Sequence, residues 1–377
     1  MKQQEMMQMK KANNNLEILT QLSNGKKQIV LLLDVLNHFI RNFVASYGLL
    51  QDNAGNDVSA LYNSITSLIA IVRNIKSNTA QLPIKIFASS EQGRSPVFKE
   101  IMKEYKQNRP KSTITSVEDM ERSEAFKTNI KEFEDFLRYL YPVVQLFHIL
   151  NIEGDFLLAY ILHKIYNKDN LYIIISTDKD FYQLISDNVV ILNPIQNIII
   201  SKENASEMLK LKTNLDVKYY HILKTLTGDK SDNIKGLTGN ITAAKIINSV
   251  LPYLEGNTDF ESFLNAIQQN IKQFNGKVYR NILEQQDYLR KSHKIMDLSE
   301  KNIYNLLTTA NIVDIESIFE NNEHNGSQEI QIAEINELYK KHNFDFDLLI
   351  RTKRAFSNAN TIFGYEHIFK EQIDKMT

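Results

Sequence analysis

The sequence predicts an α/β protein: a mainly parallel central sheet flanked by helices, followed by a helical subdomain. Long helical-looking segments separate three β-type runs, and two shorter runs follow the third. Continuously apolar runs such as IVLLL and LYIIIS are typical of strands that helices cover on both faces. After about residue 205 the strand signals end and helix-sized segments dominate. The expected strands are Ile29–Leu33, Ile84–Phe87, Leu171–Ser176, Val189–Leu192 and Ile198–Ile200.

The chain divides into four expected regions. Its first residues are polar, rich in Asn and Gln and without an apolar period, which predicts a flexible tail. Its last residues mix charged helical stretches with the polar break NNEHNGS, and they predict only a helical extension. The regions are the tail 1–25, the α/β core 26–204, the helical subdomain 205–310 and the C-terminal extension 311–377.

Composition narrows the class of protein without naming a partner. Of 377 residues, 43% are apolar and 24% are charged, and no apolar run approaches the roughly 20 residues that span a bilayer. The chain has no cysteine, which excludes disulfides, and its Met-rich start lacks the apolar stretch of a secretory signal. We expect a cytoplasmic monomer without membrane contact, in the host cytoplasm if a phage encodes it. Because the net charge is −1, any DNA contact requires a local basic surface.

Seven carboxylates lie in four short groups, each after an apolar run where a loop is expected to start. Carboxylates two positions apart at a strand end can point into one cleft, and such oxygen ligands suit Mg²⁺ or Mn²⁺. Two such ions polarise a phosphate and lower the pKa of a water molecule. One isolated pair is more often a solvated turn, whereas four groups are hard to explain as separate surface features. The residues are Asp34, Glu153, Asp155, Asp178, Asp180, Asp229 and Asp232.

A local basic stretch lies between Arg94 and Lys111, where the acidic residues are only Glu100 and Glu104. Beside a carboxylate cleft, this stretch can bind phosphates by counterion release. The same spacing also fits a solvated amphipathic helix. Its basic residues are Arg94, Lys99, Lys103, Lys106, Arg109 and Lys111.

The segment GLTGNITAAKII predicts a backbone contact with duplex DNA. Gly236 and Gly239 permit close approach of a turn, and Thr242 is expected to cap a helix whose N–H groups face a phosphate. Lys235 and Lys245 can strengthen that grip.

The histidines predict no binding site. They are scattered along the chain without the spacing of metal ligands, so we interpret them as structural or surface groups. Those concerned are His38, His148, His163, His221 and His293.

Five motifs carry a family resemblance: LLLDVLNHFIR, EYKQNR, IEGD, STDKDFYQL and TGDKSDNIKGLTG. In this order and at these separations, the chain resembles the bacteriophage flap endonucleases, the 5′-nuclease domain of bacterial DNA polymerase I and eukaryotic flap endonuclease. The resemblance implies a PIN-like nuclease core with a helix-three-turn-helix DNA module. It also implies a structure-specific 5′ nuclease that uses two divalent metal ions on flapped, nicked or branched DNA, in replication or repair, and leaves a 5′ phosphate.

The resemblance further implies roles for single residues. Asp34, Glu153 and Asp155 match ligands of one metal site, and Asp178, Asp180, Asp229 and Asp232 match the second. The expected ions are Mg²⁺, with Mn²⁺ able to substitute, and K⁺ at the helix-three-turn-helix. Catalysis is assigned to Lys106, Arg109, Asp178 and Asp180. DNA binding is assigned to Arg41, Lys99, Tyr105, Lys106, Arg109, Gly236, Gly239, Thr242 and Lys245.

In the matching EYKQNR motif, Lys106 and Arg109 are expected to contact the reacting phosphate, and Tyr105 to stack on a base. Residues 90–135 correspond to the arch or clamp through which the 5′ strand passes. Replication proteins are further expected partners.

The chain departs from the family pattern at the metal site. Phe156 stands where an additional carboxylate is common, and Ala88 or Ser89 stands where an Asp usually follows the second strand. The nearest acid, Glu91, is expected to lie in a loop, where it is either a solvated surface residue or folds back to supply an outer-sphere carboxylate to the site. Two alternatives stay open: a catalytically impaired DNA-binding protein, if one metal site is lost, and a PIN-type ribonuclease.

Overall fold

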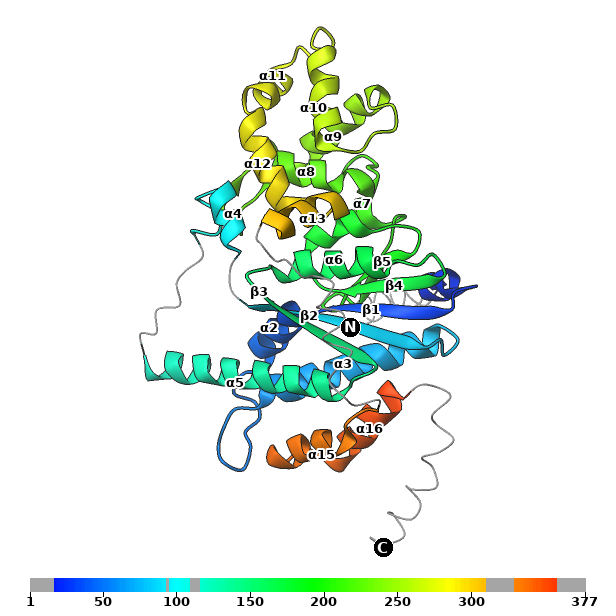
Figure 1. The fold of residues 1–377 in the computed structure, drawn as a ribbon, viewed down its shortest axis with the longest axis vertical. Coiled ribbons are helices and arrows are strands. Elements are labelled where there is room, and N and C mark those ends of the chain that lie inside the picture. The colour runs from blue at the N-terminus through cyan, green and yellow to red at the C-terminus, as the bar shows by residue number, and fades with distance from the viewer. Residues whose placement is uncertain (1–16, 93–94, 109–115, 310–328, 358–377) are drawn as a thin grey trace, which may run out of the picture.

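The computed structural model describes residues 17–92, 95–108, 116–309 and 329–357. Its centre is a six-stranded sheet with the strand order β3-β2-β1-β4-β5-β6 (Figure 1). The pairs from β3 to β5 are parallel, and β6 is antiparallel to β5, which confirms the mainly parallel sheet. The strands are β1 (Gln28–Asp34), β2 (Ile84–Gln92), β3 (Val144–Leu150), β4 (Asn170–Ile175), β5 (Val189–Asn193) and β6 (Ile198–Ile200).

Helices cover both faces of this sheet, as the apolar strands predict. Along β1, Ile29, Leu31 and Leu33 enter one hydrophobic core, while Val30 and Leu32 enter the other. This alternation follows from the two-residue period of a strand. On one face lie α2 (Val35–Ser46), α3 (Ser59–Asn78) and α5 (Val117–Tyr139); on the other lies α6 (Gly154–Ile165) (Figure 1).

The helical subdomain continues the core that α6 covers. Between α8 and α9 a short antiparallel hairpin, β7 (Gly228–Asp229) and β8 (Ile234–Lys235), interrupts the helices. Gly228 has a φ of +69°, and a Cβ atom at Gly236 would lie 1.9 Å from the Thr227 carbonyl oxygen, so the chain crossing here requires both glycines. The helices are α7 (Ala205–Met208), α8 (Tyr220–Thr227), α9 (Asn240–Val250), α10 (Phe260–Gln269), α11 (Lys277–Glu284), α12 (Gln286–Met296) and α13 (Glu300–Thr309).

The C-terminal extension includes a helical hairpin, α15 (Ile332–Lys341) and α16 (Phe346–Phe356), which packs on α3 and α5 at the end of the molecule opposite the helical subdomain (Figure 1). His342, between the two helices, contacts Asp52 at 3.3 Å and Glu132 at 3.0 Å. The described part of the C-terminal extension thus contains two helices.

The structure corrects three element predictions. Residues 17–23 are helical and Leu19 is buried in the core, so the predicted tail 1–25 is too long. Strand β2 continues past Phe87 to Gln92 because it pairs with β3 along its whole second half. β3 itself was not predicted.

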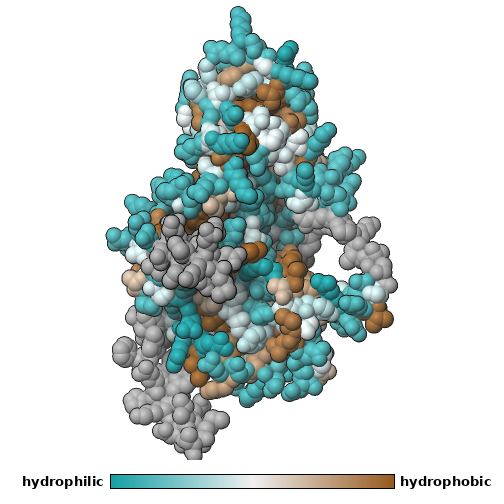
Figure 2. Space-filling view, turned by 180° about the vertical axis from the view of Figure 1, so that it is seen from behind, coloured by the Kyte–Doolittle hydropathy of each residue, from teal (hydrophilic) through white to brown (hydrophobic). Residues whose placement is uncertain are grey.

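Among the described residues, no helix is both long enough and apolar enough to cross a membrane. On the face drawn in Figure 2, hydrophobic residues form scattered patches between hydrophilic ones.

Candidate active site

Asp34 lies at the carboxyl end of the central strand β1 and is the N-cap residue of α2. Its Oδ1 accepts a hydrogen bond from the Asn37 backbone N–H at 3.0 Å, and its Oδ2 accepts one from the Ser176 hydroxyl at 3.2 Å. Ser176 follows β4, the parallel neighbour of β1. The pKa of Asp34 is raised to about 7, mainly by burial and also by the charge of the nearby Asp178, while the Asn37 hydrogen bond opposes the shift.

The turn after β3 supplies two more carboxylates at the start of α6. Glu153 is buried, and its Oε2 accepts hydrogen bonds from the Tyr105 hydroxyl at 2.8 Å and from the Lys106 ammonium group. Its other oxygen, Oε1, is buried without a hydrogen-bond partner. Burial and the charges of Glu153 and Asp178 raise the pKa of Asp155 well above its usual range.

The loop after β4 places Asp178 and Asp180 next to these groups. Asp178 caps the 3₁₀ helix Lys179–Leu184, since its Oδ1 accepts from the Asp180 backbone N–H at 2.9 Å. Burial and the charge of Asp178 raise the pKa of Asp180 to about 7, although the ammonium group of Lys224 opposes the shift.

The β7–β8 hairpin brings Asp229 and Asp232 to the same place from the helical subdomain. Burial would raise the pKa of Asp229, but the ammonium group of Lys224, at 2.6 Å, and the Ser231 hydrogen bonds hold it at about 2. The Asp232 carboxylate accepts from the Tyr105 hydroxyl at 3.2 Å, and its backbone carbonyl accepts from the Lys106 N–H at 2.8 Å.

Two lysines join the carboxylates of the sheet to those of the helical subdomain. Lys106 pairs with Glu153 and lies 4.0 Å from Asp232. Lys224 bridges Asp180 and Asp229. No motif in the sequence pointed to Lys224; the one sequence feature that could have done so is its position three residues before the TGDKSD motif.

The donor set fits divalent cations of the Mg²⁺ class. All of the candidate ligand atoms are carboxylate oxygens, and the Glu153 Oε1 atom is buried without a hydrogen-bond partner. Burial, together with repulsion between neighbouring carboxylates, raises the pKa values of Asp34 and Asp155. Among the described residues, these carboxylates form no group of three whose ligand atoms all lie within 4.8 Å of one another. Carboxylates at this spacing suit ions that keep part of their water shell, and two of them, Asp178 and Asp229, line a pocket.

Two residues of the EYKQNR motif, Tyr105 and Lys106, are more deeply buried than the sequence suggests. Tyr105 is 3% exposed and packs on Phe98, so the expected stacking of its ring on a base is wrong for this structure. Lys106 is 5% exposed. Lys99 is exposed on α4 (Pro96–Ile101), and Arg109 lies outside the described residues.

Arg41 lies on α2 beside this cleft. Its Nη2 contacts His38 Nδ1 at 3.1 Å, and its Nη1 is buried without a hydrogen-bond partner. Burial lowers the pKa of Arg41, and the charge of Asp34 opposes the shift.

A pocket of about 360 Å³ extends the cleft from Asp178 and Asp229 to Asn240, the first residue of α9. A second pocket, of about 410 Å³, is lined by Gly239 and Thr242. Gly239 is the N-cap residue of α9 and offers no side-chain cap, so the first turn of the helix lines these pockets with backbone N–H groups that no cap side chain satisfies. The prediction that Thr242 caps the helix is wrong, because Thr242 lies inside the first turn. Lys245 is exposed one turn further on.

The positions that depart from the family pattern have defined contacts. Phe156 is buried and its ring centroid lies 4.8 Å from that of Phe98, which ties α6 to α4. Ser89 pairs with Asp34 in the sheet register, and its hydroxyl donates to the Gly154 carbonyl at 3.1 Å. Glu91 lies on β2 and not in a loop, and its Cβ would be 3.8 Å from a Cβ atom at Gly154. Its charge also raises the pKa of Asp34, so Glu91 lies at the edge of the cleft.

Comparison with known sequences finds one family and two relatives that are all described as 5′-3′ exonucleases. The family described as "5′-3′ exonuclease, N-terminal resolvase-like domain" matches residues 29–212. A 5′-3′ exonuclease of Buchnera aphidicola is 27% identical over 215 residues, which cover 56% of this chain and 66% of that protein. The 5′-3′ exonuclease of Aquifex aeolicus is 26% identical over 208 residues, which cover 55% of this chain and 64% of that protein. The chain thus spans slightly less than two thirds of these relatives.

Solved structures share the fold. A crystal structure of a bacteriophage T5 protein co-crystallised with metal ions has a TM-score of 0.59 at 18% identity and covers 79% of this chain and 100% of that chain. A T5 flap endonuclease in a pseudo-enzyme–product complex with DNA and metal ions has a TM-score of 0.58 at 18% identity and covers 78% and 100%. The predicted PIN-like α/β fold is confirmed.

Proposed function

We propose that this chain, which belongs to the family of 5′→3′ exonucleases and flap endonucleases, is a divalent-metal-dependent 5′ nuclease acting on branched DNA. One observation carries the proposal. Seven carboxylates from four separate segments meet at the carboxyl edge of a parallel sheet, beside two lysines and the free N-terminus of a helix. This is the edge at which α/β proteins bind their substrates.

The carboxylates would hold two ions, Mg²⁺ or in its place Mn²⁺. Bound there, the ions supply Lewis-acid stabilisation of a phosphate and lower the pKa of a water molecule. The proposed ligands of one ion are Asp34, Glu153 and Asp155, and those of the other are Asp178, Asp180, Asp229 and Asp232.

Cations of the chain itself hold the cleft together and orient the phosphate. Lys106 is fixed by Glu153 and by the Asp232 backbone, so its charge has a defined place beside the cleft. Lys224 is likewise held beside the cleft, by ion pairs with Asp180 and Asp229. Arg109 is proposed to contact the same phosphate.

Duplex DNA is proposed to bind along the first turn of α9. The N–H groups after Gly239 suit a phosphate, and Lys245 adds a cation one turn later. No atom lies within 4 Å of a Cβ position at Gly239, which leaves room for close approach of a backbone or for K⁺. Gly236 supports the turn by permitting its contact with Thr227.

The arch proposed for residues 90–135 would guide the 5′ single strand past the cleft. Helix α4, which carries Lys99, lies at the start of this arch. The first half of α5 is exposed and charged, while its second half packs on the core. Substrates of this class have a 5′ flap, a nick or a branch. We also propose that the chain is a monomer and that it acts together with replication proteins.

The test uses 5′-labelled flap DNA, a matching RNA flap and nicked duplex, with Mg²⁺ or with EDTA. We expect metal-dependent release of the DNA flap and a product end that carries a 5′ phosphate. Tight binding without cleavage would favour the impaired DNA-binding protein, for which Phe156 and Ser89 in place of carboxylates give a reason. Preferred cleavage of the RNA flap would favour the ribonuclease.

A further inference from the structure

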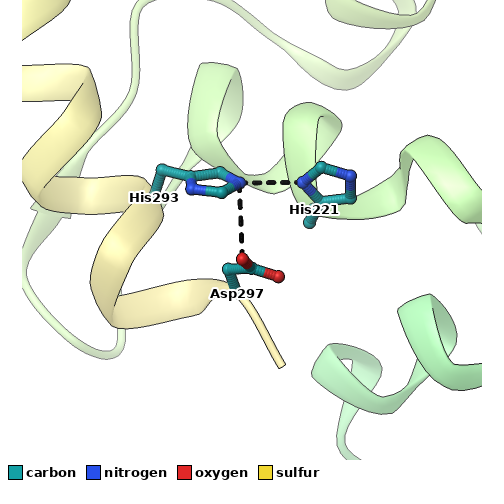
Figure 3. Close-up of side chains that lie close together, drawn as sticks. All are labelled: His221, His293 and Asp297. Atoms are coloured by element: carbon teal, nitrogen blue, oxygen red, sulfur yellow. Dashed lines mark hydrogen bonds and ion pairs between the residues drawn. The ribbon is translucent and has the colours of Figure 1, made fainter. Parts of the chain in front are cut away.

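A second cluster of metal-binding side chains lies in the helical subdomain. Two histidines that are 72 positions apart in the sequence, His221 on α8 and His293 on α12, face each other with Nδ1 and Nε2 at 2.8 Å (Figure 3). The Asp297 carboxylate lies 4.0 Å from Nε2 of His293. The ligand atoms of these three residues all lie within 4.8 Å of one another. The sequence spacing, from which these histidines were interpreted as structural or surface groups, does not show that His221 and His293 lie together.

We propose that His221, His293 and Asp297 bind a transition-metal ion of the Zn²⁺ class. Imidazole nitrogen with one carboxylate is a donor set that suits Zn²⁺ and Co²⁺, whereas Mg²⁺ prefers oxygen alone. Tetrahedral bonds of about 2.0–2.1 Å place neighbouring donors about 3.3 Å apart. The distances of 2.8 Å and 4.0 Å lie on either side of that value, so small side-chain rotations suffice. Water would take the fourth position.

The protonation state of the two rings is compatible with metal binding. Burial lowers the pKa of His293 to about 4 and also lowers that of His221, so both rings are neutral near pH 7 and can offer lone pairs. A plain hydrogen bond between the rings needs a proton on one of the two facing nitrogens. A bound ion needs lone pairs on both of these nitrogens. The protonation of the facing nitrogens therefore distinguishes a simple hydrogen bond from a metal site.

Outer contacts hold the donors in place, as is usual around metal ions. The ring of His293 stacks on Phe260 with a centroid distance of 4.7 Å. Asp297 accepts hydrogen bonds from the Ser299 backbone N–H at 2.9 Å and from its hydroxyl at 2.7 Å. The donors are therefore oriented before any ion binds.

The position of the cluster gives the ion a structural role. It would join α8 to the end of α12, and the residues next to Asp297 are already tied to the cleft through Gln183. The Gln183 side chain accepts from the Leu298 N–H at 2.8 Å, and it donates to the Met296 carbonyl at 3.0 Å and the Asp180 carbonyl at 2.9 Å. An ion here would rigidify the helical subdomain against the sheet without touching the substrate.

Co²⁺ is the probe, added to the chelator-treated full chain in excess Mg²⁺, which occupies the carboxylate cleft. We expect one equivalent of Co²⁺ to give the intense visible band of four-coordinate cobalt, and Zn²⁺ to displace it and to raise the melting temperature. His221→Gln and His293→Gln should abolish the band and weaken Zn²⁺ binding by more than the roughly 10- to 100-fold loss typical of an outer contact.

Two control variants separate this site from its surroundings. His163→Gln removes a neighbouring histidine whose Nε2 contacts the Leu298 carbonyl at 2.9 Å, and Asp155→Asn alters the carboxylate cleft. Both should keep the cobalt band. Absence of the band in the wild-type protein, or an unchanged band in His293→Gln, would overturn the proposal. If His293→Gln does not fold, Asp297→Asn, which keeps the side-chain shape, takes its place with the same expected loss.

Discussion

Helix α8 contributes to two clusters of ionisable side chains with opposite electrostatics. Lys224 reaches into a cleft of anions, where burial and mutual repulsion raise the pKa of Asp34 and Asp180 to about 7. His221, one turn earlier, enters a cluster where burial keeps two imidazoles neutral. The first environment needs positive charge, and the second offers lone pairs. Damage to the first should therefore reduce turnover, and damage to the second should reduce rigidity.

The largest expected effect comes from a carboxylate that the proposal assigns to a metal. Asp178→Asn removes a ligand's charge at constant volume, so kcat on a 5′ flap should fall on the order of 10²-fold or more, about 2.7 kcal/mol of barrier, while flap binding stays nearly intact. Single-turnover cleavage and flap binding are measured together. Asp187→Asn is the control, because the Asp187 side chain is 88% exposed and forms an ion pair with Lys202. If Asp178→Asn kept more than a tenth of wild-type turnover, Asp178 would not be a metal ligand, and the proposed difference between the two clusters would be wrong.

Lys106→Ala should slow chemistry more than it weakens binding. The residue is one of several cations near the DNA, but its charge is fixed in the cleft by Glu153, so we expect a rate loss of roughly 10²-fold and only a few-fold change in Kd. Lys103→Ala, an exposed lysine of the same segment, is the control. An unchanged single-turnover rate with a raised Kd would make Lys106 a docking residue only.

Glu91→Gln tests whether a carboxylate at the edge of the cleft contributes to metal binding. Glu91 lies beside Gly154 and raises the pKa of Asp34, so it is placed to supply the carboxylate that Ser89 lacks. Its amide should raise the Mg²⁺ concentration for half-maximal cleavage by roughly 10- to 100-fold. Mg²⁺ titrations of Glu100→Gln, on the exposed side of α4, should match the wild type. Identical titrations for the two variants would exclude Glu91 from the site.

The smallest effect is expected in a third cluster, far from both. Hydrogen bonds from His342 and Lys341 lower the pKa of the partly buried Glu132 although burial alone would raise it. A carboxyl group whose pKa is lowered by folding stabilises the fold above its unfolded pKa, and this contribution is lost as the pH falls through the folded value. Between about pH 6 and pH 3 the melting temperature of the wild type should therefore fall more steeply than that of Glu132→Gln.

The control for this pH profile is Glu337→Gln, an exposed position on the same hairpin whose side chain is 68% exposed. Its melting profile should follow the wild type. Parallel profiles for Glu132→Gln and the wild type would show that the ion pairs of the hairpin contribute nothing measurable.

The carboxylate cleft could be predicted from the sequence because its parts are local. Asp34 ends an apolar strand, and Asp178 and Asp180 follow another, so the parallel sheet brings them to one edge. Strand β1 and strand β4 are also nearly as predicted, since their apolar runs are continuous.

The remaining features depend on tertiary packing. The burial of Tyr105 follows from its contacts with Glu153 and Asp232, which are distant in the sequence. Lys224 has a role only because α8 lies over the cleft, and the pair His221 and His293 exists only because α8 packs on α12. No spacing rule along the chain could have shown these contacts.

The most direct test follows Mg²⁺-dependent cleavage of a 5′-labelled DNA flap in three metal-stripped proteins: the wild type, Asp155→Asn and His293→Gln. We expect no cleavage without metal, restored cleavage on adding Mg²⁺ to the wild type and to His293→Gln, and a loss on the order of 10²-fold or more in Asp155→Asn. Cleavage by Asp155→Asn at the wild-type rate, or a wild-type protein that binds the flap but does not cut it at any Mg²⁺ concentration, would contradict the central claim.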